Sequence, residues 1–213
     1  MKKKKSFILL LTFFAAFTGS FLAQENKDNN ELYVEPYERA YSPGNMYFNA
    51  GVNLFYGSYN QSLSWSNYNY SSSIPVVASL EYGFTDLLSF GGYMGFRSYG
   101  WSYTIYSNKY DYSNRLFNIG VRGSFHYLPL LNEHLDLGFD ERHFDFYATL
   151  MLGARILTES VTEPNLRTTD TSSRGFFGGA LGFRYMFNNT FGAYVEGGRS
   201  SLGRLNIGLT IKI

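Results

Sequence analysis

The stretch Leu205–Ile213 reads LNIGLTIKI and alternates strictly. Apolar side chains stand at positions 205, 207, 209, 211 and 213, and polar or small residues stand between them. Successive side chains of a β-strand point to opposite faces, so this period of two predicts a strand with one apolar and one polar face. Such a strand needs neighbours of the same kind.

Seven further stretches show the same alternation. They are MYFNAGVNLFYG (46–57), IPVVASLEYGF (74–84), LLSFGGYMGFR (87–97), LFNIGVRGSFHY (116–127), HFDFYATLMLGARI (143–156), FFGGALGFRYMF (176–187) and FGAYVEGG (191–198). None of the eight has a convincing apolar period of about 3.6, which a helix would require. The composition agrees, because 19 Tyr, 20 Phe and 22 Gly favour strands and tight turns.

Strands that are apolar on one face fit two environments. A soluble barrel puts the apolar face inside, and a transmembrane barrel puts it outside, against lipid. Aromatic residues at strand ends, such as Tyr82, Tyr127 and Tyr185, favour the second, because amphipathic rings suit the headgroup level. The predicted fold of residues 45–213 is therefore an all-β, eight-stranded antiparallel up-and-down transmembrane β-barrel.

The polar faces would then line the lumen. They are biased toward Arg, which suits fixed and paired sites, and Gly residues lie among the charges. Small and large residues together can fill a narrow barrel. We therefore predict a lumen plugged by a charge network that comprises Glu81, Arg97, Arg122, Asp145, Arg155, Arg184, Glu196 and Lys212.

The connections alternate in length. Those at 85–86 and 188–190 are short, and those at 58–73, 98–114 and 159–174 are long, as in barrels with short periplasmic turns and long outer loops. The connections at 128–143 and 199–203 break this alternation. The first two long segments are rich in Tyr, Ser and Asn, a composition typical of adaptable recognition surfaces. Their recognition candidates are Trp65, Tyr68, Tyr70, Trp101, Tyr103 and Tyr106. The alternative is that these Tyr residues extend the strands and anchor them at the interface.

The N-terminus predicts export. MKKKK is followed by the apolar run FILLLTFFAAF (7–17), the pattern of a secretory signal peptide over residues 1–23. Cleavage is expected after Ala23, or alternatively after Ser20. Residues 24–44 are polar and contain two prolines, which predicts a flexible periplasmic segment. Cysteine is absent, so disulfides and thiolate metal sites are excluded.

Taken together, residues 45–213 resemble small bacterial outer-membrane β-barrels of the OmpA/OmpX type, within the "outer membrane protein beta-barrel domain" group. The resemblance lies in ASLEYGFTDLLSFGGYMGFRSY (78–99), LFNIGVRGSFHY (116–127), FYATLMLGARI (146–156) and FFGGALGFRYMFNNTFGAYVEGG (176–198). It implies residence in the cell outer membrane after signal cleavage. It also implies contact with outer-membrane lipid and with the barrel insertion machinery.

The final strand also resembles the C-terminal insertion signal of such barrels. Polar Asn206 and small Gly208 precede apolar Ile211 and Ile213, although the usual final residue is Phe. The last strand is expected to pair with the first, since an open sheet edge cannot exist in lipid.

The sequence predicts no catalytic, cofactor or metal site. Ser124 and His126 share a face, but at the inner end of their strand, and the Gly-rich runs lack the following helix of a nucleotide-binding loop. The acidic residues between 133 and 145 match no metal-binding loop. Nothing indicates a nucleic-acid partner. We expect a monomeric, non-enzymatic barrel with a structural or surface-interaction role. The alternatives are a lipid-modifying enzyme, a small porin-like channel or a soluble ligand-binding barrel.

Overall fold

The computed structural model describes residues 38–55, 68–106, 108–163 and 166–213, so the expected signal peptide lies outside it. Within these ranges the chain is almost entirely strand. In chain order the elements are β1 (Met46–Leu54), β2 (Tyr68–Ser72), β3 (Val76–Gly83), β4 (Leu88–Ile105), β5 (Asn108–His126), α2 (Leu128–Leu135), β6 (Phe144–Glu163), β7 (Leu166–Met186), β8 (Phe191–Arg199) and β9 (Leu205–Lys212). In the described part, no helix is long and apolar enough to cross a membrane.

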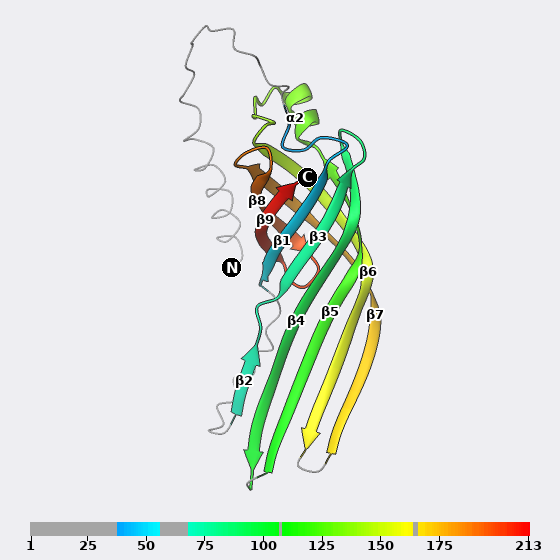
Figure 1. The fold of residues 1–213 in the computed structure, drawn as a ribbon, viewed down its shortest axis with the longest axis vertical. Coiled ribbons are helices and arrows are strands. Elements are labelled where there is room, and N and C mark those ends of the chain that lie inside the picture. The colour runs from blue at the N-terminus through cyan, green and yellow to red at the C-terminus, as the bar shows by residue number, and fades with distance from the viewer. Residues whose placement is uncertain (1–37, 56–67, 107, 164–165) are drawn as a thin grey trace, which may run out of the picture. The chain divides into compact units, whose positions relative to one another are not determined.

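Eight of the strands form a closed antiparallel ring. The order runs β4-β3-β1-β9-β8-β7-β6-β5, and pairing between β4 and β5 closes it. The last strand pairs with the first as expected, with Ala50 opposite Leu209. Short β2 lies outside the ring and pairs with β4 beyond the end of β3. The predicted eight-stranded antiparallel barrel is therefore confirmed (Figure 1).

The two faces of the ring differ sharply in polarity. Outward-pointing Leu150, Leu181 and Leu209 are 61%, 63% and 65% exposed. By contrast, inward-pointing Glu81 and Arg184 are 2% and 1% exposed. Because side chains alternate along each strand, every strand repeats this division, and the barrel is apolar outside and charged inside.

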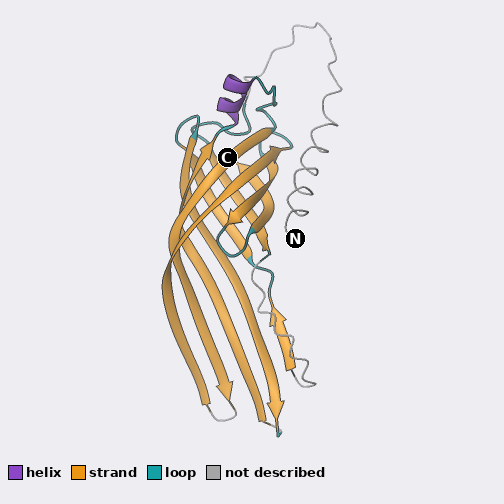
Figure 2. Ribbon diagram, turned by 180° about the vertical axis from the view of Figure 1, so that it is seen from behind, coloured by secondary structure: helices purple, strands orange, loops and turns teal. Residues whose placement is uncertain are grey.

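Four strands continue far beyond the ring. β4 to β7 have 18 to 21 residues, whereas β1, β3, β8 and β9 have 8 or 9. Their far halves form a curved four-stranded sheet that projects from one end of the barrel (Figures 1 and 2). We call this part the projecting sheet. The opposite end, which holds α2 and the end of β9, is called the helix end.

The projecting sheet corrects two predicted loops. The segments 98–114 and 159–174 were expected to be long loops, but strand pairing continues to Ile105–Asn108 and Glu163–Leu166. Tyr, Thr and Ser alternate along these segments, and aromatic and β-branched residues favour a pleated, half-buried surface. The alternative interpretation, in which the Tyr residues extend the strands, fits the second of the long segments.

The helix α2 was not predicted. It occupies the connection after β5, where Pro129 lies in the first turn and Leu128 is buried. The helix ends at Asp136, which adopts a left-handed conformation (φ 47°) and donates its backbone N–H to the Asn132 carbonyl at 3.1 Å. The segment is too short to display the repeated apolar spacing on which helix prediction depends. It explains why this connection is long at an end where a short turn was expected.

Candidate functional site in the barrel lumen

The barrel interior is filled with polar side chains. Every strand of the ring contributes at least one of them, because inward positions recur at every second residue. A buried charge is costly unless it is paired and hydrogen-bonded. The buried charged residues of the strands are Glu81, Arg97, Arg122, Asp145, Arg184, Glu196 and Lys212.

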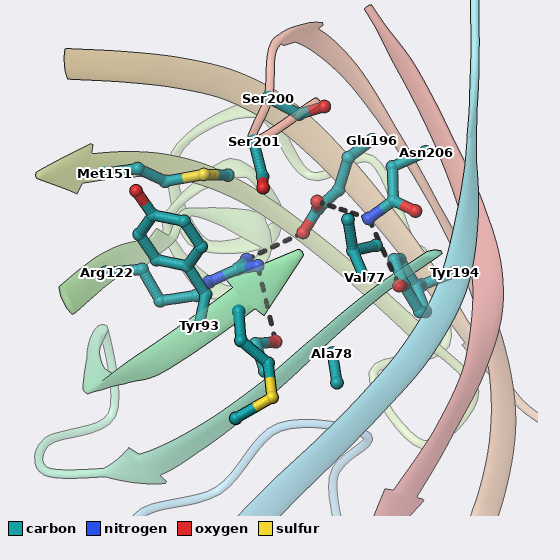
Figure 3. Close-up of a pocket in the computed structure, with 12 residues that line it drawn as sticks. Val77, Ala78, Tyr93, Arg122, Met151, Tyr194, Glu196, Ser200, Ser201 and Asn206 are labelled. Carbon is teal, nitrogen blue, oxygen red and sulfur yellow. Dashed lines mark hydrogen bonds and ion pairs between the residues drawn. The ribbon is translucent and has the colours of Figure 1, made fainter. Parts of the chain in front are cut away.

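Arg122 on β5 bridges two carboxylates near the middle of the lumen. Its Nη2 donates to Glu196 Oε1 at 2.6 Å, and its Nε lies 3.2 Å from Glu81 Oε1, within ion-pair distance but misaligned for a hydrogen bond. Glu81 accepts a further bond from Ser124 Oγ at 2.5 Å, and Glu196 accepts one from Tyr147 OH at 3.1 Å. Strands β3, β5, β6 and β8 are thus cross-linked from inside, and Figure 3 shows the contact between Arg122 and Glu196.

A second charged group lies nearer the helix end. Asp145 on β6 accepts from Arg184 Nη1 at 2.9 Å, and its other oxygen lies 2.9 Å from His126 Nδ1. The Arg184 guanidinium also lies 4.7 Å from the Tyr47 ring centroid and 5.2 Å from that of Tyr147. These cation–π contacts stabilise a guanidinium held away from water.

Ser89, His126 and Asp145 are connected in the order of a hydrolase triad. Ser89 Oγ lies 3.0 Å from His126 Nε2, and Asp145 lies at the opposite ring nitrogen. A nucleophile must reach its substrate, yet Ser89 is 1% exposed and its hydroxyl also donates to Glu81 Oε2 at 3.1 Å. The arrangement therefore belongs to the packed polar network.

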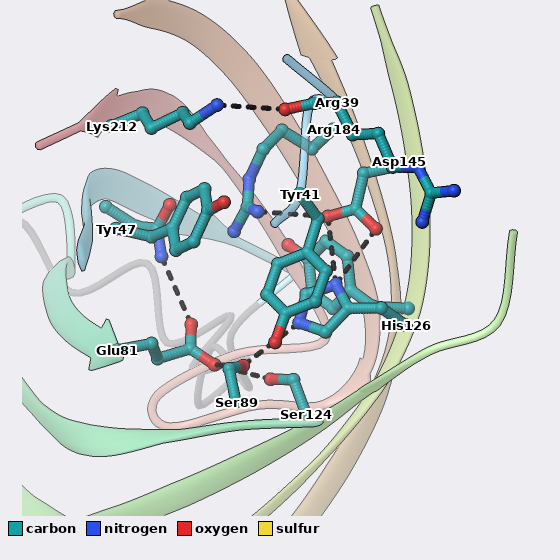
Figure 4. Close-up of polar contacts among 12 residues, drawn as sticks. Arg39, Tyr41, Tyr47, Glu81, Ser89, Ser124, His126, Asp145, Arg184 and Lys212 are labelled. Atoms are coloured by element: carbon teal, nitrogen blue, oxygen red, sulfur yellow. Dashed lines mark hydrogen bonds and ion pairs between the residues drawn. The ribbon is translucent and has the colours of Figure 1, made fainter. Parts of the chain in front are cut away.

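Tyr41 lies against the polar side chains at the helix end of the barrel interior. Its ring stacks on His126 (Figure 4), with centroids 3.4 Å apart. Its hydroxyl lies 2.6 Å from the Leu88 carbonyl and 2.8 Å from that of Thr85. Burial raises the pKa of the Tyr41 phenol, and the charges of neighbouring groups raise it further, so the hydroxyl remains protonated as a donor.

Other contacts hold the segment that carries Tyr41. The Lys212 ammonium donates to Glu38 Oε2 at 3.1 Å and to the Arg39 carbonyl at 2.9 Å, and Ala40 N–H donates to the Glu141 carbonyl at 2.7 Å. Residues 24–44 were predicted to be flexible. The described part of that segment, from Glu38 onward, packs across the mouth because it satisfies donors and acceptors at the strand ends.

The β8–β9 connection packs against the lumen side chains from the other end of the ring. Ser200, Ser201 and Leu202 are buried, and the Ser201 carbonyl accepts from Asn118 Nδ2 at 2.8 Å and from Arg155 Nη2 at 3.1 Å. This connection is short and turns into the barrel, so it forms no outer loop. Between it and Arg122 lies a cavity of about 10 Å³ (Figure 3), at the lower limit for one water molecule.

The remaining predicted lumen cations, Arg97 and Arg155, contact aromatic rings and neutral oxygen atoms. Arg97 lies 5.0 Å above the Tyr99 ring and donates to Ser72 Oγ at 3.4 Å. Arg155 contacts the Ser201 carbonyl and lies 5.1 Å from the Phe176 ring centroid. The structure therefore groups Glu81, Arg122 and Glu196, places Asp145 with Arg184, and leaves these two cations nearer the projecting sheet.

The aromatic recognition candidates fall mainly on the projecting sheet. Trp101 stacks on Tyr112 across β4 and β5, with centroids 5.2 Å apart, and Tyr103 stacks on Tyr110 at the same separation. Their positions alternate in phase with the lumen residues, so the stacks lie on the inner, concave face.

The other candidates are less clustered. Tyr70 on β2 is 49% exposed, and Tyr106, at the tip of the β4–β5 hairpin, is 95% exposed. Tyr68 begins β2 opposite Tyr103. Trp65 lies outside the described residues.

The C-terminal candidates are divided between the two faces of β9. Asn206 points inward and donates to Tyr194 OH and Glu196 Oε2, each at 3.1 Å. Gly208 lies opposite Gly51 in the β1–β9 pair, where a Cβ would collide with the Ala50 carbonyl. Ile211 lies on the apolar outer face, and Ile213 is 71% exposed.

The acidic residues around α2 form local contacts. Asp140 lies 2.9 Å from His143 Nδ1, and Glu141 lies 3.0 Å from Arg39 Nε. Partial burial raises the Asp140 pKa, but hydrogen bonds from the Arg142 backbone N–H and from His143 outweigh it, so the pKa lies below its ordinary value. Among the residues described, no group of three or more His, Cys, Asp or Glu could hold a metal ion.

Sequence reasoning missed three features of the lumen: the contact between Ser89 and His126, the position of Tyr41, and the inward turn of the β8–β9 connection. Ser89 and His126 come from different strands, and their proximity depends on the β4–β5 register. Tyr41 lies in a segment without periodicity. The only available signal for the inward loop was that residues 199–203 are too few for an outer loop.

Comparisons with known proteins find solved β-barrel structures of low sequence identity to this chain. No protein-family model matches the chain, and no curated protein matches it. The N-terminal β-barrel domain of Pseudomonas aeruginosa OprF is 11% identical with a TM-score of 0.42, covering 81% of this chain and 100% of that one. Ail, the attachment invasion locus protein of Yersinia pestis, solved in complex with the heparin analogue sucrose octasulfate, is 10% identical with a TM-score of 0.45, covering 80% and 95%.

The class of the protein rests on its own strand ring. Eight antiparallel strands, an apolar exterior and a charged interior define a small up-and-down β-barrel. Strand number and topology agree with the resemblance to OmpA/OmpX-type barrels found in the sequence.

Proposed function

We propose that this chain is an integral outer-membrane β-barrel with a closed lumen, which holds a projecting sheet outside the cell as a surface for interaction. The observation that carries the proposal is the continuous apolar exterior around a closed ring of strands. Outward side chains such as Phe90, Val121 and Leu150 are 57%, 63% and 61% exposed. Water would penalise such a surface, whereas hydrocarbon favours it, and a closed ring leaves no unpaired backbone within the bilayer.

The orientation follows from the ends of the strands. Barrels of this kind place their chain termini and short turns in the periplasm and their longer hairpins outside. The helix end would face the periplasm, and the projecting sheet would extend outward with Trp101, Tyr103 and Tyr112 on its concave face. Parallel aromatic rings offer large contact area at low entropic cost, which suits binding of an extracellular ligand.

The lumen supports a structural role over a channel role. An eight-stranded barrel has room only for side chains, and here ion pairs fill its centre while Tyr41 and Ser201 lie at its two ends. Purified protein in planar bilayers should give no steady single-channel current. Large, steady currents would instead indicate a small porin.

The proposal assigns no catalytic role. Ser89 should not react with a fluorophosphonate probe in the folded protein, because it is 1% exposed beneath Tyr41. Labelling of Ser89, together with altered lipid A in cells that express the chain, would favour the lipid-modifying alternative.

Cell fractionation tests the membrane assignment directly. The full-length chain, expressed with its own N-terminus, should sediment with outer membranes and require detergent for release. On gels without heating it should migrate as a compact folded form. Recovery from the periplasm in soluble form without detergent would overturn the proposal.

A further inference from the structure

Three arginines gather where the apolar exterior of the barrel ends. On the outer face of β6, Ile156 is the last apolar residue and is followed by the polar Thr158. On the outer face of β7, Phe177 is the last apolar residue and is followed by Gly175 and Ser173. Arg155 and Arg174 lie at this level as direct partners in the β6–β7 pair. Arg199, the last residue of β8, lies opposite Gly179 on the other side of β7.

Phe176 brings two of these cations together. The Arg155 guanidinium carbon lies 5.1 Å from its ring centroid, and that of Arg199 lies 5.9 Å from it. Arg174 occupies the same face of β7 as Phe176, two residues along the strand. Directly opposed strand residues have Cβ atoms about 4.5–5.5 Å apart, so Arg155 and Arg174 are close neighbours.

This cluster has no acidic partner in the described part of the chain. Arg122 and Arg184 each contact a carboxylate deeper in the lumen, but no ion pair involves Arg155, Arg174 or Arg199. The next acids on the same faces, Glu159 and Asp170, are four residues further along their strands, roughly 13 Å away. Adjacent like charges destabilise a sheet, and an anion between them would remove that repulsion.

The cluster is also accessible. β8 pairs with β7 only between Gly179 and Met186, so no described strand covers the other edge of β7 from Leu166 to Gly178. Arg174 and Arg199 are exposed, while Arg155 is anchored from below by the Ser201 carbonyl at 3.1 Å. Arg155 is thus held in place at the base of the site, and Arg174 and Arg199 are accessible from solvent.

We propose that Arg155, Arg174 and Arg199 form a binding site for a phosphate-type oxyanion, specifically a phosphate monoester. The inference rests on the proposed function, because it places the site at the outer boundary of the membrane. A planar guanidinium donates two parallel hydrogen bonds to such a group, and three guanidiniums can neutralise a dianion. The phosphate belongs either to a lipid headgroup of the outer leaflet or to a soluble ligand on the concave sheet.

Calorimetry of the folded mature chain in zwitterionic detergent tests the site. The probe is inositol hexakisphosphate, and uncharged myo-inositol is the negative control. The parent should bind the phosphorylated probe saturably. Because two charge-assisted contacts are lost, Arg174→Gln with Arg199→Gln should weaken binding by at least about tenfold. The matched control, Arg115→Gln with Arg167→Gln, removes two exposed cations from the outer face and should change affinity less than about twofold, since salt screens distant charges.

A lipid arm distinguishes the two sources. The same proteins are placed in phosphatidylcholine nanodiscs that contain phosphatidic acid, and retained lipid is measured by native mass spectrometry. Retention of phosphatidic acid by the parent but not by the Arg174/Arg199 variant assigns a lipid headgroup. Binding of the soluble probe alone assigns a soluble phosphorylated ligand, and both results support the site.

The inference is overturned if the folded parent binds neither probe, or if the control pair weakens binding as much as the test pair. Folding and bilayer insertion are checked separately by gel mobility without heating. Failure of the parent to insert would contradict the proposed function, whereas normal insertion without phosphate binding would contradict only this inference.

Discussion

The ring of Tyr41 lies flat on the imidazole of His126, with centroids 3.4 Å apart and planes 6° from parallel. Tyr41 precedes the first strand, and His126 is the last residue of β5. The contact therefore joins the segment before β1 to the helix end of β5. It covers the point at which His126, Asp145 and Ser89 meet. The cover over His126 at this end is therefore a residue outside the barrel strands.

Removal of the Tyr41 ring should expose His126. In the parent, His126 is 1% exposed and should resist diethylpyrocarbonate, which modifies accessible imidazoles. Tyr41→Ala should accelerate modification of His126 at least several-fold, while exposed His134 reacts equally in both proteins. Tyr41→Phe retains the ring and should protect nearly as well as the parent. Mass spectrometry of peptides measures both sites, and equal His126 reactivity in parent and Tyr41→Ala would contradict the covering role.

Asp145→Ala should be the most damaging change in the charge network. It would leave Arg184, which is 1% exposed, without its carboxylate, and breaking a buried pair in this way costs about 3–5 kcal/mol. Denaturant unfolding of the barrel in lipid vesicles measures the loss. The exposed pair Lys109–Asp111 supplies the control, since Asp111→Ala should cost about 0–1 kcal/mol. Similar losses for both variants would show that the lumen pairs are solvated.

Glu81→Ala should cost less than Asp145→Ala. Arg122 would keep its 2.6 Å contact with Glu196, so the guanidinium stays paired. The loss would come mainly from Ser124, whose hydroxyl would lose its Glu81 acceptor, and one buried unsatisfied group costs about 1–3 kcal/mol. Ser89 would keep its contact with His126, and Asn49 would keep its bond to Ser79. The same unfolding assay ranks the two variants, and the reverse order would contradict the pairing found here.

Leu150→Arg should test the outer face. Leu150 is 61% exposed and lies within the apolar exterior, where a cation at the bilayer midplane costs about 2–4 kcal/mol. Thr158→Arg, on the same face of β6 but beyond the apolar residues, should cost only about 0–1 kcal/mol. Folding into vesicles is the measurement. Equal folding of Leu150→Arg and the parent would show that this face does not meet hydrocarbon.

Gly182→Ala should disturb the lumen sterically. A Cβ at position 182 would collide with the Tyr147 ring, which lies beside Arg184. The hydroxyl of the same side chain donates a hydrogen bond to Glu196. Overpacking of this kind costs about 1–3 kcal/mol. Gly175→Ala is the control, because a Cβ there has no neighbour within 4 Å, and its effect should stay within about 0.5 kcal/mol. A neutral Gly182→Ala would mean that Tyr147 moves freely.

The alternation of apolar and polar residues was sufficient to predict the strands of the barrel wall, but it predicted the connections poorly. Alternation in 143–156 and 176–187 correctly identified the parts of β6 and β7 that lie in the barrel wall, because the apolar face repeats at every second residue. The polar extensions 159–163 and 166–174 lack that contrast, since both faces meet water, and were interpreted as a loop. Helix α2 was missed because eight residues contain too few helical turns to establish a period.

The sequence by itself determined which side chains share a face, and hence that Glu81, Arg122, Asp145, Arg184 and Glu196 lie on the face opposite the leucines. That information is local, because it depends only on the two-residue repeat of a strand. Only the tertiary structure decided which charges meet: Arg122 with Glu81 and Glu196, and Arg184 with Asp145. Those pairs depend on strand register and ring closure. The contacts of Tyr41 and Ser201 depend on where segments without periodicity find partners for their polar groups.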